Sequence, residues 1–240
     1  MRILAVADVH CPRYLHMFEK SLAEMKAPDL FLLAGDMIDR GRISQYDVVL
    51  NAIKERFDDD FPIVACFGNE EYLEVRDEIA DIFGDRISFL DDQSIVLEIQ
   101  GIRFGIVGTQ GSLDKPTRWQ KQNLPRIKRV FGRRPSRVEH LLKKLSRKTD
   151  YRILLMHYAP CLETCQGAND RSFGAFGSKK FYSMIEAEKP NLVIHGHVHD
   201  ATRQETRIGP TLVRNVALPA AEGVTGLKLS MIIKRESGTE

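Results

Sequence analysis

The sequence predicts an α/β protein in which two sheets pack face to face and helices cover them on the outside. Two observations point to this fold class. In the first half of the chain, short apolar runs alternate with amphipathic stretches of helical period. In the second half, strand-like runs recur, and Gly-Pro or Gly-rich turns separate several of them. A length of 240 residues and a hydrophobic content of 43% suit a single domain over residues 1–240.

The first half is interpreted as three strands with helices between and after them. Apolar runs predict buried strands over residues 3–7, 30–34 and 63–67. Ser44, followed three residues later by Asp47, is typical of a helix start. The apolar faces of the three expected helices are Leu15, Phe18, Leu22 and Met25, then Tyr46, Val49, Ile53 and Phe57, then Val75, Ile79, Ile82 and Phe83. This alternation implies right-handed crossovers and a largely parallel sheet.

The second half predicts a hairpin and further strands. Residues 94–99 and 103–107 are expected to form the hairpin around Gly101. A helix that carries Phe181, Met184 and Ile185 is expected between two buried strands. The expected strands of this half lie at 152–156, 192–194, and near 201–208, 211–217 and 227–234.

Residues 112–149 are interpreted as an insertion or cap. Its core, residues 115–148, is polar and basic, and Val138, Leu141, Leu142 and Leu145 form one helical face there. Glu139 alone opposes thirteen cations, which are Lys115, Arg118, Lys121, Arg126, Lys128, Arg129, Arg133, Arg134, Arg137, Lys143, Lys144, Arg147 and Lys148. The segment could bind a nucleic-acid backbone, with Trp119 stacking on a base. A solvated cap or a dimer interface is the favoured interpretation, so a homo-oligomer stays open.

Composition sets few further limits. Lys+Arg 35 and Asp+Glu 33 give a formal net charge of +2, which argues neither for nor against a nucleic-acid partner. No apolar run approaches the roughly 18 residues that span a bilayer, and the N-terminal run is too short for a signal peptide, so we expect a cytoplasmic protein without membrane contact. The cysteines lack a disulfide-framework spacing and are expected to be free thiols: Cys11, Cys66, Cys161 and Cys165.

Five apolar strands each end in a residue that can bind a metal ion. Because ligands collect outside the carboxyl ends of strands in crossover-connected sheets, parallel neighbours would bring these ends to one rim. The set offers carboxylate, amide and imidazole donors, which suit Mn²⁺ first, with Fe, Zn²⁺ or Ni²⁺ as alternatives, and do not suit Ca²⁺. The candidates are Asp8, His10, Asp36, Asn69, His157, His197 and His199.

Two of the candidate pairs have a spacing of two. In Asp8-x-His10 and His197-x-His199 both side chains share a face only if the backbone is still extended, so we expect extended backbone at both pairs. His195 should then face away from the ligands and pack structurally. Sharp turns at these strand ends would need residues without a Cβ atom, which are present as Gly35, Gly68 and Gly196.

Five sequence blocks carry these residues. They are D-x-H at 8–10, G-D-x-x-D-R-G at 35–41, G-N-E-E at 68–71, a lone His after an apolar strand, and G-H-x-H at 196–199. In this order they resemble the calcineurin-like metallophosphoesterases, and the resemblance spans positions 8 to 199. It implies a four-layer α/β/β/α sandwich of two mixed sheets flanked by helices.

The resemblance also implies a mechanism with two divalent metal ions. The first ion would be held by Asp8, His10, Asp36 and His199. Asp36 would bridge to the second ion, which is completed by Asn69, His157 and His197. A hydroxide between the ions would attack a small phosphodiester or phosphomonoester, and a diester is preferred. Two alternatives stay open, a nuclease and a catalytically silent scaffold of the same fold.

Two positions need separate treatment. Position 70 is Glu where the family usually has a His that protonates the leaving group. Two dications would keep a carboxylate ionised, so Glu70 is expected to position other groups, and substrates with acidic leaving groups are favoured. Arg40 matches the Arg that binds phosphate in the phosphoprotein phosphatase branch of the family. The residues around His10 and Asn69 do not match that branch. A surface ion pair between Arg40 and Asp39 is therefore an equal alternative.

Overall fold

The first sheet forms half of the molecular core. The computed structural model describes residues 1–57, 60–168, 173–228 and 230. The sheet has the strand order β11-β1-β2-β3-β4, and β1 to β4 are parallel while β11 runs antiparallel to β1. Its strands are β1 (Arg2–Val6), β2 (Leu30–Ala34), β3 (Ile63–Cys66), β4 (Ser88–Phe89) and β11 (Thr225–Lys228).

The second sheet is also mixed. Its order is β5-β6-β7-β8-β10-β9, in which β5 and β9 are the antiparallel edges. The expected hairpin is confirmed as β5 paired with β6 around Gln100 and Gly101, both of which have positive φ. The strands are β5 (Gln93–Ile99), β6 (Ile102–Thr109), β7 (Tyr151–Met156), β8 (Leu192–His195), β9 (Glu205–Ile208) and β10 (Thr211–Asn215).

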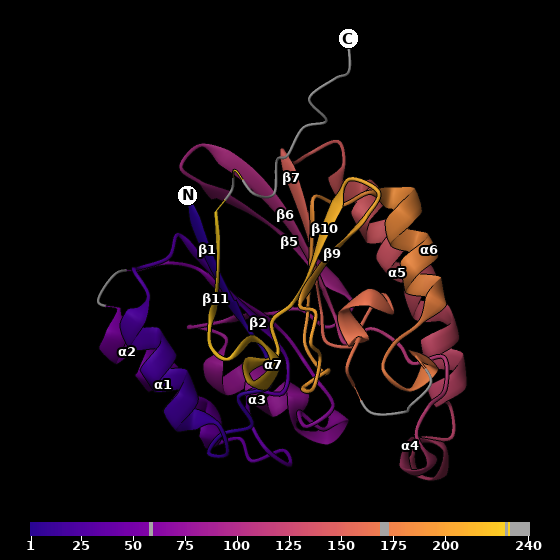
Figure 1. Ribbon diagram of the computed structural model, residues 1–240, viewed down its shortest axis with the longest axis horizontal. Coiled ribbons are helices and arrows are strands. Elements are labelled where there is room, and N and C mark those ends of the chain that lie inside the picture. The colour runs from indigo at the N-terminus through magenta and orange to yellow at the C-terminus, as the bar shows by residue number, and fades with distance from the viewer. Residues whose placement is uncertain (58–59, 169–172, 229, 231–240) are drawn as a thin grey trace.

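Helices cover the outer face of each sheet, so the expected four-layer α/β/β/α sandwich is confirmed (Figure 1). The first sheet carries α1 (Leu15–Glu24), α2 (Gln45–Arg56) and α3 (Arg76–Phe83). The second carries α5 (Ile127–Leu145) and α6 (Lys179–Glu188). Two short helices, α4 (Arg118–Asn123) and α7 (Leu218–Ala221), and three 3-10 turns, Leu73–Val75, Glu163–Cys165 and Phe173–Ala175, lie in connections.

The uninterrupted apolar runs of the central strands follow from these layers. On β1, Ile3 and Ala5 pack between the two sheets, whereas Leu4 and Val6 pack against the helices. On β7, Leu155 points into the layer between the sheets and Leu154 toward α5 and α6. Because successive strand residues point to opposite faces, burial of both faces requires an apolar residue at every position.

Helix α5 continues through a proline. Pro135 has no N–H to donate to the carbonyl of Phe131 four residues earlier. The hydroxyl of Ser112 donates to that carbonyl instead, at 3.1 Å. Beyond Pro135, Val138 and Leu142 are buried against the second sheet, so this half of α5 belongs to the outer layer of the sandwich.

The remaining differences from the sequence expectations concern element ends. The strand expected near 201–208 begins only at Glu205, and β4, α4 and α7 were not expected. The expected strand near 227–234 is seen as Thr225–Lys228, and the residues at 229 and 231–234 lie outside the described part. Helix α2 begins after Ser44 as expected, but the Ser44 side chain makes no capping hydrogen bond.

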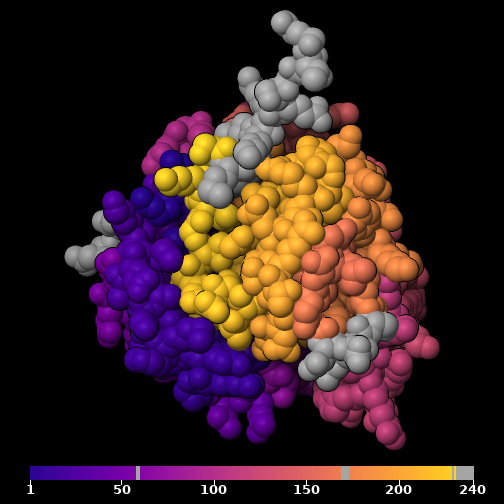
Figure 2. Space-filling view, in the orientation of Figure 1, coloured from indigo at the N-terminus to yellow at the C-terminus, as the bar shows by residue number. Residues whose placement is uncertain are grey.

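The C-terminal part of the chain connects the two halves of the molecule. In Figure 2 its yellow residues lie between the indigo N-terminal part and the orange part of the second half. The backbone at Ala7 pairs with this segment, because Ala7 N–H donates to Val216 O at 3.0 Å and Leu218 N–H donates to Ala7 O at 2.9 Å. None of the helices in the described part is long and apolar enough to cross a membrane.

Candidate metal centre

The carboxyl ends of β1, β2 and β8 bring the first group of candidate ligands together. Asp8 Oδ1 lies 2.9 Å from His199 Nε2 and 3.6 Å from His10 Nε2. The two imidazoles also face each other, with 3.4 Å between their Nε2 atoms. Asp36 Oδ2 approaches the same group, 3.7 Å from His10 Nε2. These four side chains form one cluster of oxygen and nitrogen donors.

The second group of candidate ligands stands on the other side of Asp36. His157 Nε2 lies 3.3 Å from Asp36 Oδ2 and 3.1 Å from Asn69 Oδ1. Its other ring nitrogen, Nδ1, lies 2.9 Å from the carbonyl of Ala34, which can only accept a hydrogen bond. His157 therefore donates from Nδ1 and turns Nε2 toward Asp36 and Asn69, the orientation that a metal ligand needs.

His197 lies next to the second group. Its ring centroid is 5.1 Å from that of His157 and 4.8 Å from that of Tyr158, both in edge-on arrangements. Its backbone N–H donates to Asp8 Oδ2 at 2.8 Å, which ties the end of β8 to the end of β1. Burial, followed by the charge on His157, lowers the pKa of His197 to about 3. The imidazole is therefore neutral, as a metal ligand must be.

The donor set fits a metal centre. Asp8 and Asp36 are almost completely buried, and a buried carboxylate needs a compensating charge. Throughout the described part of the chain, the ion-pair partners of these two carboxylates are histidines and include no Lys or Arg. Two groups of ligand atoms, which have Asp8 in common, are close enough to share an ion: Asp8, His10 and His199, and Asp8, Asp36 and His157. Divalent ions would supply the missing positive charge.

The carboxylates and imidazoles of the cluster shift one another's pKa values. Burial opposes ionisation of Asp8, but hydrogen bonds from His10 and His199 outweigh it and hold the pKa of Asp8 well below its usual value. Burial likewise opposes a charge on His157, yet the adjacent Asp36 raises the pKa of His157 to about 9.

The backbone at the ligands differs from the expectation of extended strands. Asp8 and His10 have φ values of 60° and 42°, and His197 has 70°. These are left-handed conformations beyond the ends of β1 and β8, so the extended-backbone prediction for both pairs is wrong. Asp36 is left-handed as well, with φ 53°. Such strain persists only where surrounding bonds hold it, and it is typical of functional sites.

Two glycines lie where a Cβ atom would collide with a candidate ligand. A Cβ atom on Gly68 would lie 2.1 Å from Asp36 Oδ1, and one on Gly196 would lie 2.5 Å from Asp8 Oδ2. Both distances are far below contact, so any larger residue would displace a candidate ligand. Gly35 is required for two reasons, because its φ of 83° is accessible mainly to glycine and because a Cβ atom there would lie 2.5 Å from Gly68 N.

Glu71 is a functional residue that the sequence reasoning missed. It is fully buried, and its two oxygens accept hydrogen bonds from the backbone N–H groups of Asp36, Met37 and Gly68 at 2.7–2.8 Å and from the hydroxyl of Tyr46 at 3.2 Å. Burial, then the charge on Asp36, raises the pKa of Glu71. It fixes the turn that carries Asp36. The only feature of the sequence that could have indicated this role is the position of Glu71 in the G-N-E-E block.

Glu70 contacts groups around the centre rather than the ligand clusters themselves. Its backbone N–H donates to Asp36 Oδ1 at 2.7 Å. Its side chain accepts from the backbone N–H of Arg40 at 2.9 Å and from the amide of Asn69 at 3.3 Å. The side chain thus connects the turn after β2 to the turn after β3.

The structure places the side chains of Arg40 and His195 away from the ligand clusters. The Arg40 side chain is 71% exposed, and its Nε lies 3.7 Å from Asp39 Oδ2, the surface pairing that the sequence left open. His195 is buried and lies 2.8 Å from the hydroxyl of Thr164, and burial lowers its pKa to about 4. The four cysteines are buried free thiols, and Cys161 and Cys165 pack near Thr164.

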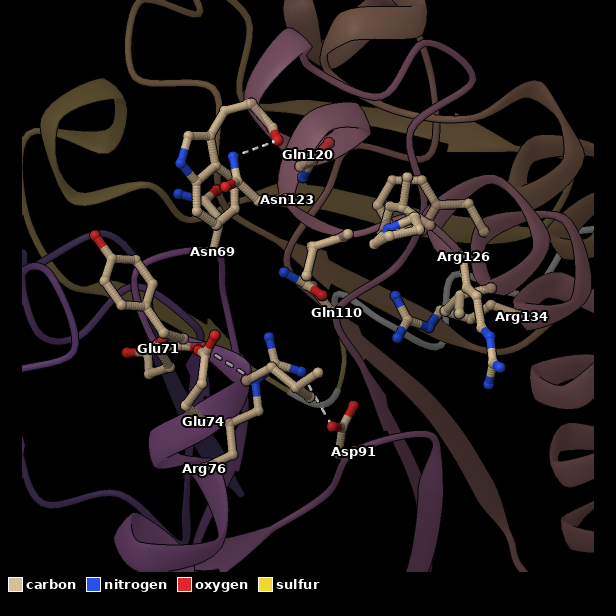
Figure 3. A pocket seen from close by; sticks show the side chains of 18 residues that line it. Asn69, Glu71, Glu74, Arg76, Asp91, Gln110, Gln120, Asn123, Arg126 and Arg134 are labelled. Carbon is tan, nitrogen blue, oxygen red and sulfur yellow. Dashed lines mark hydrogen bonds and ion pairs between the residues drawn. The ribbon is translucent and has the colours of Figure 1, made fainter.

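A pocket of about 460 Å³ opens beside the centre (Figure 3). Asn69 lies on its edge, and the turn that follows Asn69 forms one wall. The basic segment forms the opposite wall through α4 and the start of α5. The two walls are seen in Figure 3, where Arg126 and Arg134 stand across the pocket from Glu71 and Arg76.

The cations of the basic segment are exposed with one exception. Arg134 is buried, donates from Nε to Asp92 Oδ2 at 3.0 Å and donates from Nη1 to Gly111 O at 2.7 Å. Arg134 is therefore engaged within the protein, unlike the exposed cations that the sequence groups with it. Nucleic-acid binding by the exposed cations over 115–148 stays a prediction.

Comparison with known proteins gives the family. The sequence profile of the calcineurin-like phosphoesterases matches residues 1–201. The chain belongs to this family. Members typically bind two divalent metal ions, and this calcineurin-like chain has the buried Asp and His clusters for them. No curated protein sequence matches it significantly.

Solved structures agree on the fold of this calcineurin-like chain. A phosphopantetheinyl hydrolase from Mycobacterium tuberculosis superposes with a TM-score of 0.68 at 15% identity, over 98% of this chain and 93% of the hydrolase. A Thermus thermophilus protein, TT1561, superposes with a TM-score of 0.56 at 17% identity, over 95% of this chain and 98% of TT1561. A putative 5'-nucleotidase from Staphylococcus aureus superposes with a TM-score of 0.57 at 13% identity, over 89% of this chain and 48% of the nucleotidase. Identities this low establish the architecture alone.

Proposed function

We propose that the protein is a phosphoesterase that depends on two divalent metal ions, and that its substrate is a phosphodiester in preference to a phosphomonoester. The position of Asp36 is the observation that carries this proposal. Its Oδ2 lies 3.7 Å from His10 Nε2 and 3.3 Å from His157 Nε2, so one carboxylate faces both groups of candidate ligands. A shared carboxylate of this kind is what a two-ion site requires.

Each ion has a set of residues that would hold it. Asp8, His10, Asp36 and His199 would bind the first. Asp36, Asn69, His157 and His197 would bind the second. Two bound ions supply a nucleophile at neutral pH, by lowering the pKa of bound water, and neutralise the phosphoryl oxygens. Mn²⁺ is the preferred metal, and Fe, Zn²⁺ or Ni²⁺ are alternatives that the ligand chemistry allows.

The chain itself would orient these groups. Glu71 holds the Asp36 turn through backbone hydrogen bonds, and Ala34 fixes the ring of His157. Burial keeps Asp8 and Asp36 away from bulk water, so their charge acts at short range on the ions and the substrate. No side-chain nucleophile is needed in this scheme.

Turnover of bis(p-nitrophenyl) phosphate by metal-stripped protein, with each of the four metals added back, tests the proposal. We expect hydrolysis that depends on added metal and falls at least a hundredfold in Asp36→Asn. Asp39→Asn, three residues along the same turn, is the matched control and should keep wild-type activity. Equal rates for the wild type and Asp36→Asn, or hydrolysis of neither diesters nor monoesters with any metal, would refute it.

The position of Glu70 supports a preference for esters with acidic leaving groups. Its carboxylate accepts hydrogen bonds from the backbone N–H of Arg40 and the side-chain amide of Asn69, so it would position these groups rather than protonate a leaving group. A good leaving group needs no protonation. We expect Glu70→His to raise the rates of alkyl phosphodiesters relative to aryl ones. A series of diesters with graded leaving-group pKa measures this, and an unchanged dependence would remove the idea.

A further inference from the structure

The pocket shares Asn69 with the candidate metal centre and extends beyond it, and its position and chemistry suggest a ligand. We propose that it binds the organic group of the phosphate ester, and that this group carries an aromatic ring that packs on Trp119. This inference rests on the proposed function and specifies the class of substrate.

Position is the first argument. Asn69 is both a candidate ligand of the second ion and a lining residue of the pocket. Gln110, also in the lining, donates to the carbonyl of Gly68 at 3.0 Å, so the inner end of the pocket adjoins the loop that carries Asn69. A phosphoryl group held at the metal centre would therefore direct one of its substituents into the pocket.

Three polar side chains of the pocket are engaged in hydrogen bonds within the protein. Arg76 donates to Gly68 O and Glu71 O and pairs with Asp91 at 3.0 Å. Arg134 is held by Asp92 and Gly111, as described above. Gln120 donates to the hydroxyl of Tyr158 at 3.1 Å. These three groups form a fixed frame, whereas Glu74, Arg126 and the unpartnered buried Oδ1 of Asp91 also line the pocket and offer polar atoms to a ligand.

Other parts of the pocket surface are apolar and exposed. Trp119 is 57% exposed, Leu73 is 64% exposed and Val130 is 42% exposed, and Tyr72 also lines the pocket. Four of the nine large hydrophobic side chains that are exposed in the described part thus meet in one pocket. Scattered exposed apolar residues are normal, but such a cluster marks a binding site.

Size and shape favour a small organic group. A cavity of about 460 Å³ lies within the roughly 300–1,000 Å³ of small-molecule sites. An indole presents a flat face that favours an aromatic partner. An aryl or heteroaryl substituent of one or two rings matches both properties.

Trp119 is the only tryptophan of the chain, so its fluorescence reports directly on this pocket. Metal-stripped protein is titrated with 4-phenylbutylphosphonate, and with methylphosphonate as the ligand without a ring. We expect a saturable change of emission and protection from acrylamide quenching with the aryl compound only. This readout requires no turnover and no metal, so it separates the pocket from the proposed reaction.

Matched variants locate the binding. Val130→Asn should weaken binding of 4-phenylbutylphosphonate at least fivefold, and Leu73→Asn, on the opposite wall, should do the same. Val48 on α2 is 41% exposed, nearly as much as Val130, and lies outside the pocket, so Val48→Asn should bind as the wild type does. The inference is overturned if no aryl compound changes the emission, if Val48→Asn weakens binding as much as Val130→Asn, or if an oligonucleotide protects Trp119 when the phosphonate does not.

The rates of two phosphodiesters give a second test of the pocket. Methyl p-nitrophenyl phosphate and 4-phenylbutyl p-nitrophenyl phosphate share a leaving group and differ only in the second substituent. We expect a kcat/KM at least tenfold higher for the aryl-bearing diester, and Trp119→Ala should reduce this ratio. Equal hydrolysis of both diesters would contradict the pocket assignment alone, whereas hydrolysis of neither would contradict the proposed reaction.

Discussion

Single residues at the metal centre show how a few contacts hold a buried charge in place. Asp36 has a left-handed backbone, which costs about 1–3 kcal/mol and must be stabilised by its surroundings. Glu71 provides much of that stabilisation, since it accepts the backbone N–H groups of Asp36, Met37 and Gly68 together. The sequence could predict Asp36 from its place at a strand end. It could not predict Glu71, because a glutamate is seldom fully buried and most of its partners lie far away in the chain.

Replacing Glu71 tests this support. In Glu71→Gln one of the two acceptor oxygens becomes an NH2 group, which cannot accept a hydrogen bond, so at least one buried N–H loses its partner. We expect the free energy of unfolding to fall by about 3 kcal/mol, and metal affinity to fall with it. Urea denaturation measures the free energy of unfolding, and calorimetric titration measures the metal affinity. Glu78→Gln, exposed on α3, is the control and should change stability by less than about 0.5 kcal/mol.

If Glu71→Gln and Glu78→Gln unfold at the same urea concentration, the hydrogen bonds of Glu71 do not hold the Asp36 turn. A variant with lowered stability but unchanged metal affinity would limit Glu71 to the fold.

At the scale of elements, the strands and helices followed from apolar periodicity, whereas the ligand loops did not. Burial on both faces explains why β1, β2 and β7 could be predicted from short apolar runs. Periodicity says nothing about residues beyond a strand end, so the left-handed turns at Asp8 and His10 were predicted as extended. For α5, the helical period places Arg134 four positions before Val138 on the same buried face. That signal could have identified Arg134 as structural.

Two adjacent arginines on α5 give a matched test of this assignment. Arg134 is buried against Asp92 and Gly111, whereas Arg133 is exposed. Arg134→Gln leaves the carboxylate of Asp92 poorly compensated and should cost about 3–5 kcal/mol of stability. Arg133→Gln should cost less than about 0.5 kcal/mol. Thermal unfolding measures the stability of the two variants. Equal stabilities would show that Arg134 does not anchor α5.

At the scale of the whole molecule, the candidate ligands come from both sheets. Asp8, His10, Asp36 and Asn69 follow strands of the first sheet. The remaining ligands, His157, His197 and His199, follow strands of the second sheet. Bound metal ions would therefore link the two halves of the sandwich. Such a link could not be derived from either half of the sequence alone, because it depends on how the sheets pack.

Metal removal should therefore lower the melting temperature of the whole domain. Metal present at about one hundred times its dissociation constant stabilises the folded state by about 2.7 kcal/mol, which corresponds to roughly 5–10 °C for a chain of this length. Scanning calorimetry before and after chelation measures the shift. Asp36→Asn should show little shift, because it lacks the shared ligand. A wild-type protein that melts at one temperature with and without chelator would contradict a metal link between the sheets.

The central claim is that one carboxylate, Asp36, is shared by two metal ions. Anomalous diffraction from crystals grown with Mn²⁺ tests it most directly. We expect two strong anomalous peaks, one on each side of the Asp36 carboxylate, with Asp8, His10 and His199 around one and Asn69, His157 and His197 around the other. A single peak, or none at this position in a well-folded crystal saturated with Mn²⁺, would contradict the account.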